Sequence, residues 1–297
     1  MDRNKRAAAE QGRIMTTDNG GTVIDLGGGR IEGRARESHE VVPGDIRSGF
    51  IVLCDHASNF IPPEYRNLGL PEGELARHIA WDIGAEGVAR ALAARLGAPA
   101  VISRFSRLLI DPNRGLDDPT LLMRLSDGAV VPGNARADEA EKRRRMERFW
   151  LPYDAAITDT IEAFRRHGVN PALISVHSFT PVWRGVKRPW HAALLYDPRD
   201  PDFSVHLMNH LRRDPALTVG DNEPYRGGLS GDTMDRQGFA RGLPHALVEL
   251  RQDLIFHEKG QAEWAARIAA AARAALEAIG GRQTFTPRAS AKTAIND

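Results

Sequence analysis

Three predicted buried strands carry a polar side chain at or near their carboxyl ends, and these side chains are of types that bind metals and move protons. Residues 50–56 (FIVLCDH) and residues 171–177 (PALISVH) are apolar runs that each end in a histidine. A third apolar run, residues 246–250 (ALVEL), carries Glu249 near its end. In open α/β sheets the catalytic groups lie beyond the carboxyl ends of the strands. Two histidines and a carboxylate in such positions favour a metal-assisted hydrolase.

His56 and His177 are the predicted ligands of a divalent metal ion. Each could instead be a core histidine satisfied by backbone groups, but finding the same arrangement twice argues against that. A zinc ion in a hydrolytic site takes three protein ligands and leaves one position for water. Asp82 is the best third ligand because it is an acid inside an otherwise apolar helical pattern. Asn59, three residues after His56, is the alternative, although a neutral amide is a poor zinc ligand.

Glu249 is the candidate general base, because metal-assisted hydrolysis needs a group that takes a proton from water. The alternative is that Glu249 only forms an ion pair with Arg251, two residues later.

A second polar cluster follows the apolar residues 108–110 in the order Asp111-Pro112-Asn113-Arg114. Arg114 could hold a substrate carboxylate through two parallel hydrogen bonds. Arg104 and Arg107 lie close in sequence and could assist it or pair with Asp111. A glycine-bearing loop at residues 230–235 (SGDTMD) could close over the site.

Composition excludes several other classes of function. A formal net charge of +1 gives no reason to expect nucleic acid or a membrane surface as partner. No run approaches the roughly 20 apolar residues of a membrane span, and no signal peptide is evident. The single cysteine, Cys54, suits a reducing compartment and has no activating base, and no Gly-x-Ser-x-Gly motif is present. We therefore expect a cytoplasmic protein that acts on a small molecule, and the sequence leaves open whether it forms a homo-oligomer.

Strand-like and helix-like segments alternate along most of the chain. Helical spacing or composition predicts helices at residues 72–96, 137–167 with an interruption at Pro152, 202–213 and 260–279. Further strands are predicted at residues 100–103 and 191–196. The alternation predicts a three-layer α/β fold with a mostly parallel, mixed sheet and helices on both faces. Residues 49–280 are expected to form this single domain, residues 1–48 a flexible extension and residues 281–297 a disordered tail.

The motifs DHASN, HIAWDIGA, SRFSRLLIDPNR, SVHSFTP, DNEPY, LSGDTMD and VELRQDL occur in this order between Gly49 and His257. In combination they resemble the N-formylglutamate amidohydrolase family. That family is similar in turn to the zinc carboxypeptidases and desuccinylases, which implies a zinc-exopeptidase-like (phosphorylase/hydrolase-like) fold.

The resemblance also implies roles for individual residues. Asn113 and Arg114 match the pair that holds the substrate carboxylate, His177 a zinc ligand, and Glu249 the catalytic glutamate. The chain departs from the group's first zinc motif, His-x-x-Glu, because Asn59 stands where the glutamate would be. Two candidates for the third metal ligand therefore remain, Asp82 and Asn59.

The implied reaction is zinc-dependent hydrolysis of an N-acyl amino acid such as N-formylglutamate, which gives formate and glutamate. Arg107 is the arginine expected to stabilise the oxyanion, and Arg104 and Arg251 are further candidates for substrate binding. Two alternatives stay open: a carboxypeptidase-like or longer-chain N-deacylase on the same scaffold, and a metal-free protein that binds a carboxylate without turnover.

Overall fold

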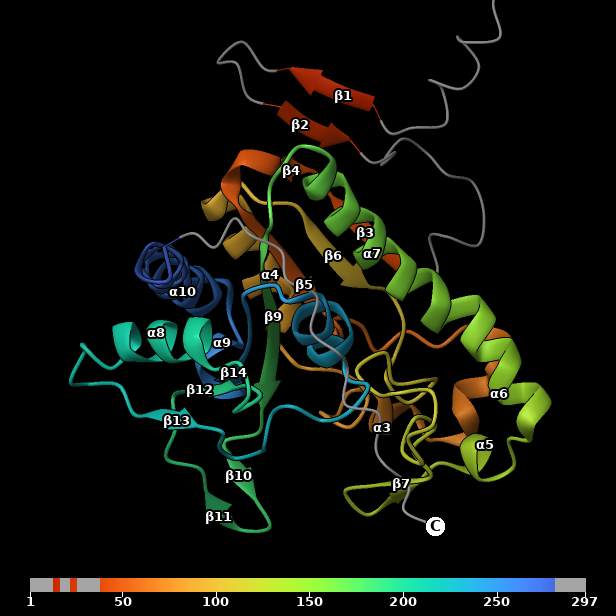
Figure 1. The fold of residues 1–297 in the computed structure, drawn as a ribbon. Coiled ribbons are helices and arrows are strands. Elements are labelled where there is room, and N and C mark those ends of the chain that lie inside the picture. Colours follow the sequence, from red (N-terminus) through yellow and green to blue (C-terminus); the bar gives the residue numbers. More distant parts are fainter. Residues whose placement is uncertain (1–12, 17–21, 26–37, 281–297) are drawn as a thin grey trace, which may run out of the picture.

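A seven-stranded sheet lies at the centre of the computed structural model, which describes residues 13–16, 22–25 and 38–280 (Figure 1). Its strands are β3 (His39–Val42), β5 (Phe50–Cys54), β6 (Ala100–Ser103), β9 (Ala172–Phe179), β12 (Ala192–Leu195), β13 (Val219–Asp221) and β14 (His245–Arg251). They lie in the order β13-β12-β14-β9-β5-β6-β3. The four central strands β14, β9, β5 and β6 are parallel. At the two sides of this group, β12 pairs antiparallel with β14 and parallel with β13, and β3 pairs antiparallel with β6. The predicted mixed, mostly parallel sheet is confirmed.

Helices cover both faces of this sheet, and the alternation of side chains along the strands assigns each face its own core. Phe50, Val52 and Cys54 of β5 pack with α4 (Ala85–Leu96), α8 (Asp202–Leu211) and α10 (Glu258–Ala278). Ile51 and Leu53 of the same strand pack on the opposite face, with α7 (Leu151–Arg166). Figure 1 shows α8 and α10 on one side of the sheet and α7 on the other. Because both faces are buried, the strands are continuous apolar runs, which is why the sequence revealed them.

The helix predicted across residues 72–96 is wrong, because the structure has a short α3 (Glu72–Leu75), a series of turns and then α4. Gly84 adopts a left-handed conformation (φ 82°) directly before α4. A Cβ atom on Gly84 would lie 2.3 Å from the carbonyl oxygen of Ile255, so only glycine fits there. Asp82 consequently lies in a turn, where its N–H donates to the carbonyl of His56 at 2.9 Å. The break in the helix brings Asp82 to the end of β5.

The second long helical pattern is interrupted as predicted. Helix α6 (Glu139–Arg145) passes through a π-helical turn (Met146–Trp150) into α7, whose first turn contains Pro152. A proline lacks the N–H of the helical ladder and is tolerated in the first turn.

The shorter elements form turns and small sheets around this frame. They are β1 (Arg13–Thr16), β2 (Thr22–Asp25), β4 (Gly44–Asp45), β7 (Leu125–Ser126), β8 (Ala129–Val130), β10 (Val182–Trp183), β11 (Val186–Lys187), α5 (Pro132–Ala135), α9 (Gln252–Ile255) and the 3-10 segments Ile46–Ser48, Pro63–Gly69 and Phe239–Arg241. None of the helices in the described ranges has the length and apolar character needed to cross a bilayer.

The folded domain begins before Gly49, which corrects the predicted boundary. Strand β3 forms one edge of the central sheet and pairs with β6 from His39 to Val42. Ile46 is 2% exposed and belongs to the core. The sequence did not reveal β3, because it is an edge strand of four residues and its one partner strand lies about 60 positions downstream. Residues 1–12, 17–21 and 26–37 of the predicted extension, and the predicted tail 281–297, lie outside the described residues.

Candidate active site

A cavity of about 230 Å³ lies where β5, β9 and β14 end. Seven of the residues singled out from the sequence line it: His56, Asp82, Arg107, Asn113, Arg114, His177 and Glu249. The volume is below the roughly 300–1,000 Å³ of sites for drug-sized ligands, so the cavity suits a small substrate.

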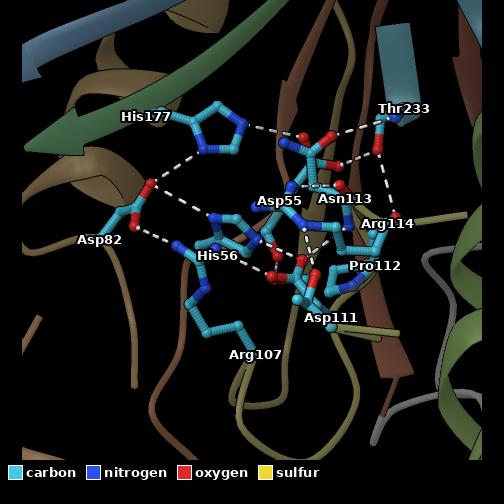
Figure 2. Close-up of polar contacts among 12 residues, drawn as sticks. Asp55, His56, Asp82, Arg107, Asp111, Pro112, Asn113, Arg114, His177 and Thr233 are labelled. Carbon is cyan, nitrogen blue, oxygen red and sulfur yellow. Dashed lines mark hydrogen bonds and ion pairs between the residues drawn. The ribbon is translucent and has the colours of Figure 1, made fainter. Parts of the chain in front are cut away.

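Two histidines and one aspartate converge at the base of this cavity (Figure 2). Asp82 Oδ2 lies 2.9 Å from Nδ1 of His177 and 3.4 Å from Nδ1 of His56. One potential ligand atom from each residue lies within 4.8 Å of the others. The side chains are nearly inaccessible, with 1% of His56, 4% of Asp82 and 2% of His177 exposed. Two imidazole nitrogens and a carboxylate oxygen form a donor set that suits zinc.

The outer nitrogen of each histidine contacts a buried carboxylate. His56 Nε2 lies 2.7 Å from Asp111 Oδ1, and His177 Nε2 lies 3.0 Å from Asp55 Oδ2. Metal-binding histidines almost always donate their second N–H to such a partner, which fixes the tautomer and the orientation of the ring. If Nε2 of His56 and of His177 carries the proton, Nδ1 of each ring keeps its lone pair. Both Nδ1 atoms lie on the side of Asp82, where a metal ion could bind them. These partners add Asp55 and Asp111 to the site.

Asp55 is itself held by residues from three parts of the chain. Its Oδ1 accepts hydrogen bonds from the Tyr153 hydroxyl of α7 and from the Thr233 hydroxyl, each at 2.9 Å. Its Oδ2 accepts from the Ser175 hydroxyl of β9 at 2.8 Å. Burial alone would raise the pKa of Asp55, but the hydrogen bond and charge of His177, the charge of His56 and the hydrogen bond from Ser175 lower it to about 2. The carboxylate therefore stays ionised and fixed in place.

The charges of this group favour a cation. Burial would lower the pKa of His177, but hydrogen bonds to Asp55 and Asp82 raise it to about 10. A histidine that binds a metal ion must be neutral. With both imidazoles neutral, the aspartates Asp55, Asp82 and Asp111 and the half-buried Arg107 leave two negative charges without compensation. A divalent ion between Asp82 and the histidines would neutralise them, so the residues present fit a metal ion.

Arg107 links two of these acids. It donates to Asp111 Oδ2 at 2.8 Å, and its Nη1 lies 3.5 Å from Asp82 Oδ1. The alternative that Arg107 pairs with Asp111 is therefore confirmed, and the same side chain also lines the cavity. Its position fixes a positive charge beside the histidine pair.

Glu249 lies next to His177 in the register of β14 and β9. It is 7% exposed, and its Oε2 has no hydrogen-bond partner within the described part of the chain. Burial raises the pKa of Glu249 to about 7. The charge of His177 opposes this rise, and the negative charge of Asp82 adds to it. The ion pair with Arg251 is not formed, because Arg251 pairs with Asp253 at 2.8 Å. A carboxyl group with a pKa near neutrality and a free oxygen is suited to accept and return a proton.

Asn113 and Arg114 lie on the cavity wall in a tight turn. The turn is held by the Asn113 N–H, which donates to Asp111 Oδ1 at 2.9 Å, and by Asn113 Oδ1, which accepts from the N–H of Thr233 at 3.0 Å. Arg114 donates to the carbonyl of Asn113 and to the Thr120 hydroxyl. The preceding apolar residues 108–110 are buried and lie in turns.

The structure moves three predicted site residues away from the cavity. Arg104 pairs with Glu86 at 3.3 Å and with Glu40 at 3.6 Å. The Asn59 amide donates to the backbone carbonyl of Leu75 at 2.9 Å and does not line the cavity, whereas Asp82 does, so the structure favours Asp82 over Asn59 as the third ligand. Arg251 binds Asp253 and backbone carbonyls. None of the three belongs to the cavity lining, because each already has a partner elsewhere.

The loop at residues 230–235 contributes Asp232 to the cavity wall. Asp232 lines the cavity and is 4% exposed, and its Oδ1 accepts a hydrogen bond from the N–H of Asp235 at 2.7 Å. Burial raises the pKa of Asp232 from 3.8 to about 6.

This shift predicts a pH-dependent effect of Asp232→Asn on stability. The folded state binds the proton of Asp232 more tightly than the unfolded state. The protonated carboxyl therefore adds to the free energy of unfolding below about pH 4, and this contribution is lost as the pH rises through about 6. The amide cannot ionise and keeps an acceptor for Asp235. The variant should gain about 2–3 kcal/mol relative to wild type between pH 4 and pH 7. Urea unfolding at both pH values measures this gain, with the exposed Asp117→Asn as control. A difference that does not change with pH would contradict the assignment.

Comparisons with known proteins identify the family of this chain. Residues 48–256 match the model of the N-formylglutamate amidohydrolase family. An N-formylglutamate deformylase from Pseudomonas aeruginosa is 26% identical over 209 residues, which cover 63% of this chain and 75% of that protein. Another from Pseudomonas putida is 28% identical over 132 residues, or 41% of this chain and 46% of that protein.

Solved structures show the same fold. A gene product of Agrobacterium tumefaciens is 31% identical, with a TM-score of 0.77 over 84% of this chain and 100% of the other. An N-formylglutamate amidohydrolase from Ralstonia eutropha is 21% identical, with a TM-score of 0.53 over 82% of this chain and 99% of the other. The family match spans most of the described domain and includes every residue of the histidine–carboxylate cluster. The chain therefore belongs to the N-formylglutamate amidohydrolase family.

Proposed function

We propose that this protein is a metal-dependent amidohydrolase that cleaves N-formylglutamate to formate and glutamate. The observation that carries the proposal is the free carboxylate oxygen of Glu249 beside the buried His56–Asp82–His177 group, in one cavity with Arg114. The names of the relatives from both Pseudomonas species support the substrate.

His56, Asp82 and His177 would hold the metal ion, for which we propose zinc. When bound, zinc supplies Lewis acidity and lowers the pKa of water toward roughly 7. The contacts of Asp111 and Asp55 on the outer nitrogens keep both rings in the orientation that such a site requires.

Glu249 carries the proton in this reaction. With a pKa of about 7, a large share of Glu249 is ionised at neutral pH and can accept a proton from the attacking water. As the C–N bond breaks, Glu249 returns the proton to the nitrogen, so that formate and the free amine of glutamate are released. The same group serves as base and then as acid.

Arg107 and the Asn113–Arg114 turn bind and orient the substrate. Arg107 is held by Asp111 and Asp82, so its charge is already in place where negative charge develops on the carbonyl oxygen. Arg114 is proposed to bind the α-carboxylate, together with the side-chain amide of Asn113. Anchoring the substrate in this way makes the attack effectively intramolecular.

A substrate panel tests the proposed function. Purified protein with its metal is offered N-formylglutamate, N-acetylglutamate, a longer N-acylglutamate and a dipeptide with a C-terminal glutamate. We expect the highest kcat/KM for the formyl compound, because the 230 Å³ cavity leaves little room for a longer acyl group. Faster cleavage of the longer acyl compound or the dipeptide would favour the deacylase or carboxypeptidase alternative. Absence of turnover on every compound would overturn the proposal.

Arg114→Lys and Arg114→Ala should separate binding from chemistry. Lysine keeps the charge but cannot make two parallel hydrogen bonds, so it should weaken binding of N-formylglutamate, and alanine should weaken it by about 2–5 kcal/mol. Wild type should prefer the free acid over its α-amide, and Arg114→Ala should lose most of this preference. Steady-state kinetics on both compounds measure it, with Arg104→Ala as a control outside the cavity. An unchanged acid-to-amide ratio in Arg114→Ala would place carboxylate binding elsewhere.

A further inference from the structure

Three arginines of the described chain line the cavity, and two of them are engaged by the protein itself. Arg107 pairs with Asp111 and Asp82, and Arg114 donates to neighbouring oxygens within its turn. Arg226, by contrast, makes no hydrogen bond or ion pair with any residue that the structure describes, although it contributes to the same cavity wall. It is a guanidinium available to an anion that enters the cavity.

Both sequence neighbours of Arg226 are held by hydrogen bonds, Tyr225 through its side chain and Gly227 through its backbone. The hydroxyl of Tyr225 accepts a hydrogen bond from Nη2 of Arg188 at 3.0 Å. The N–H of Gly227 donates to the Asn222 side chain at 2.9 Å. Gly227 lies so close to the end of β12 that a Cβ atom would come within 2.2 Å of a backbone nitrogen. Arg226 therefore lies between two held residues, which lowers the entropic cost of using it to bind a ligand.

A second arginine, Arg188, contacts the residue that precedes Arg226. Arg188 is 8% exposed and lies over the rings of Phe179, Trp183 and Tyr225 at 5.6, 5.4 and 5.2 Å. No carboxylate among the described residues forms an ion pair with Arg188, whose guanidinium donates instead to Tyr225 and to Thr180. All of these ring and hydroxyl partners line the cavity. Arg226 on the cavity wall, and Arg188 packed against three residues of that wall, thus both lack an acidic partner among the described residues.

We propose that Arg226 binds the side-chain carboxylate of the substrate and so selects N-acyl derivatives of dicarboxylic amino acids. The inference rests on the proposed function, in which Arg114 takes the α-carboxylate. A substrate with one carboxylate would leave Arg226 unpaired, whereas one with a second carboxylate gives it a charge-assisted partner. Arg226 is then the residue that distinguishes a glutamate derivative from its neutral glutamine analogue.

The test compares N-formylglutamate with N-formylglutamine, which has nearly the same shape and lacks the second charge. Arg226→Gln should lower kcat/KM for N-formylglutamate about 10- to 100-fold, the effect of losing a hydrogen bond to a charged group. For N-formylglutamine kcat/KM should change by no more than about 2-fold, because its neutral side-chain amide forms no ion pair with Arg226. Arg226→Lys should show an intermediate preference for N-formylglutamate over N-formylglutamine, since lysine keeps the positive charge but lacks the planar guanidinium group. Arg213→Gln, an exposed arginine beyond the end of α8, is the matched control and should behave as wild type.

Binding measured without turnover separates this inference from the proposed function. Calorimetry on Glu249→Gln, with and without Arg226→Gln, should show that the second change weakens N-formylglutamate but not N-formylglutamine. If Arg226→Gln affects both compounds equally, or neither, the inference is overturned. If wild type cleaves neither compound, the proposed function fails, while the binding experiment still decides the role of Arg226.

Discussion

His56→Ala and His177→Ala should each release the bound metal ion and abolish hydrolysis. Wild type is expected to contain about one zinc-like divalent ion per chain, because a hydrolytic site uses three protein ligands and both histidines direct Nδ1 toward Asp82. Removing one ligand also leaves the carboxylate behind it without its partner. Inductively coupled plasma mass spectrometry measures the metal content, and kcat is measured on the same preparations.

The control for this experiment is His206→Ala, because His206 is an exposed histidine on α8. It should keep both metal and activity. Circular dichroism shows whether each variant remains folded, so that loss of metal is not mistaken for unfolding. If the His56 and His177 variants both retain metal and full turnover, the assignment of the metal ligands is wrong.

Glu249→Gln should reduce kcat by at least about 100-fold while the metal content stays that of wild type. Glutamine has the shape of glutamate but cannot accept and return a proton. Oε2 of Glu249 has no hydrogen-bond partner in the described chain, so the substitution breaks no contact of that atom. KM should therefore remain close to its wild-type value.

Glu263→Gln provides the matched control, since Glu263 is an exposed residue of α10. Single-turnover measurements isolate the chemical step from product release. A wild-type kcat in Glu249→Gln would show that Glu249 serves the packing of β14 against β9 and not the reaction.

The chain's apolar runs determined the central strands, and its residue types determined the chemistry. β5, β9 and β14 are buried on both faces and could be recognised locally, as could the polar groups near their ends. His56, His177 and Glu249 meet because parallel neighbouring strands bring their carboxyl ends to one edge of the sheet. The fold class and these three members of the site were therefore predictable.

Only the tertiary structure decided which partners complete the site. The bonds from His56 to Asp82 and from His177 to Asp55 join residues 26 and 122 positions apart, and no local pattern specifies such pairs. The left-handed Gly84 lies in the break between α3 and α4, and this break places Asp82 beside the histidines, which favours Asp82 over Asn59 as the third ligand. Packing likewise directed Arg104 and Arg251 to other acids and left Arg226 unpaired on the cavity wall. A buried charged side chain needs an oppositely charged or hydrogen-bonding partner close to it in space. In this fold the packing of strands and turns determines which partner is close, and distance along the chain does not.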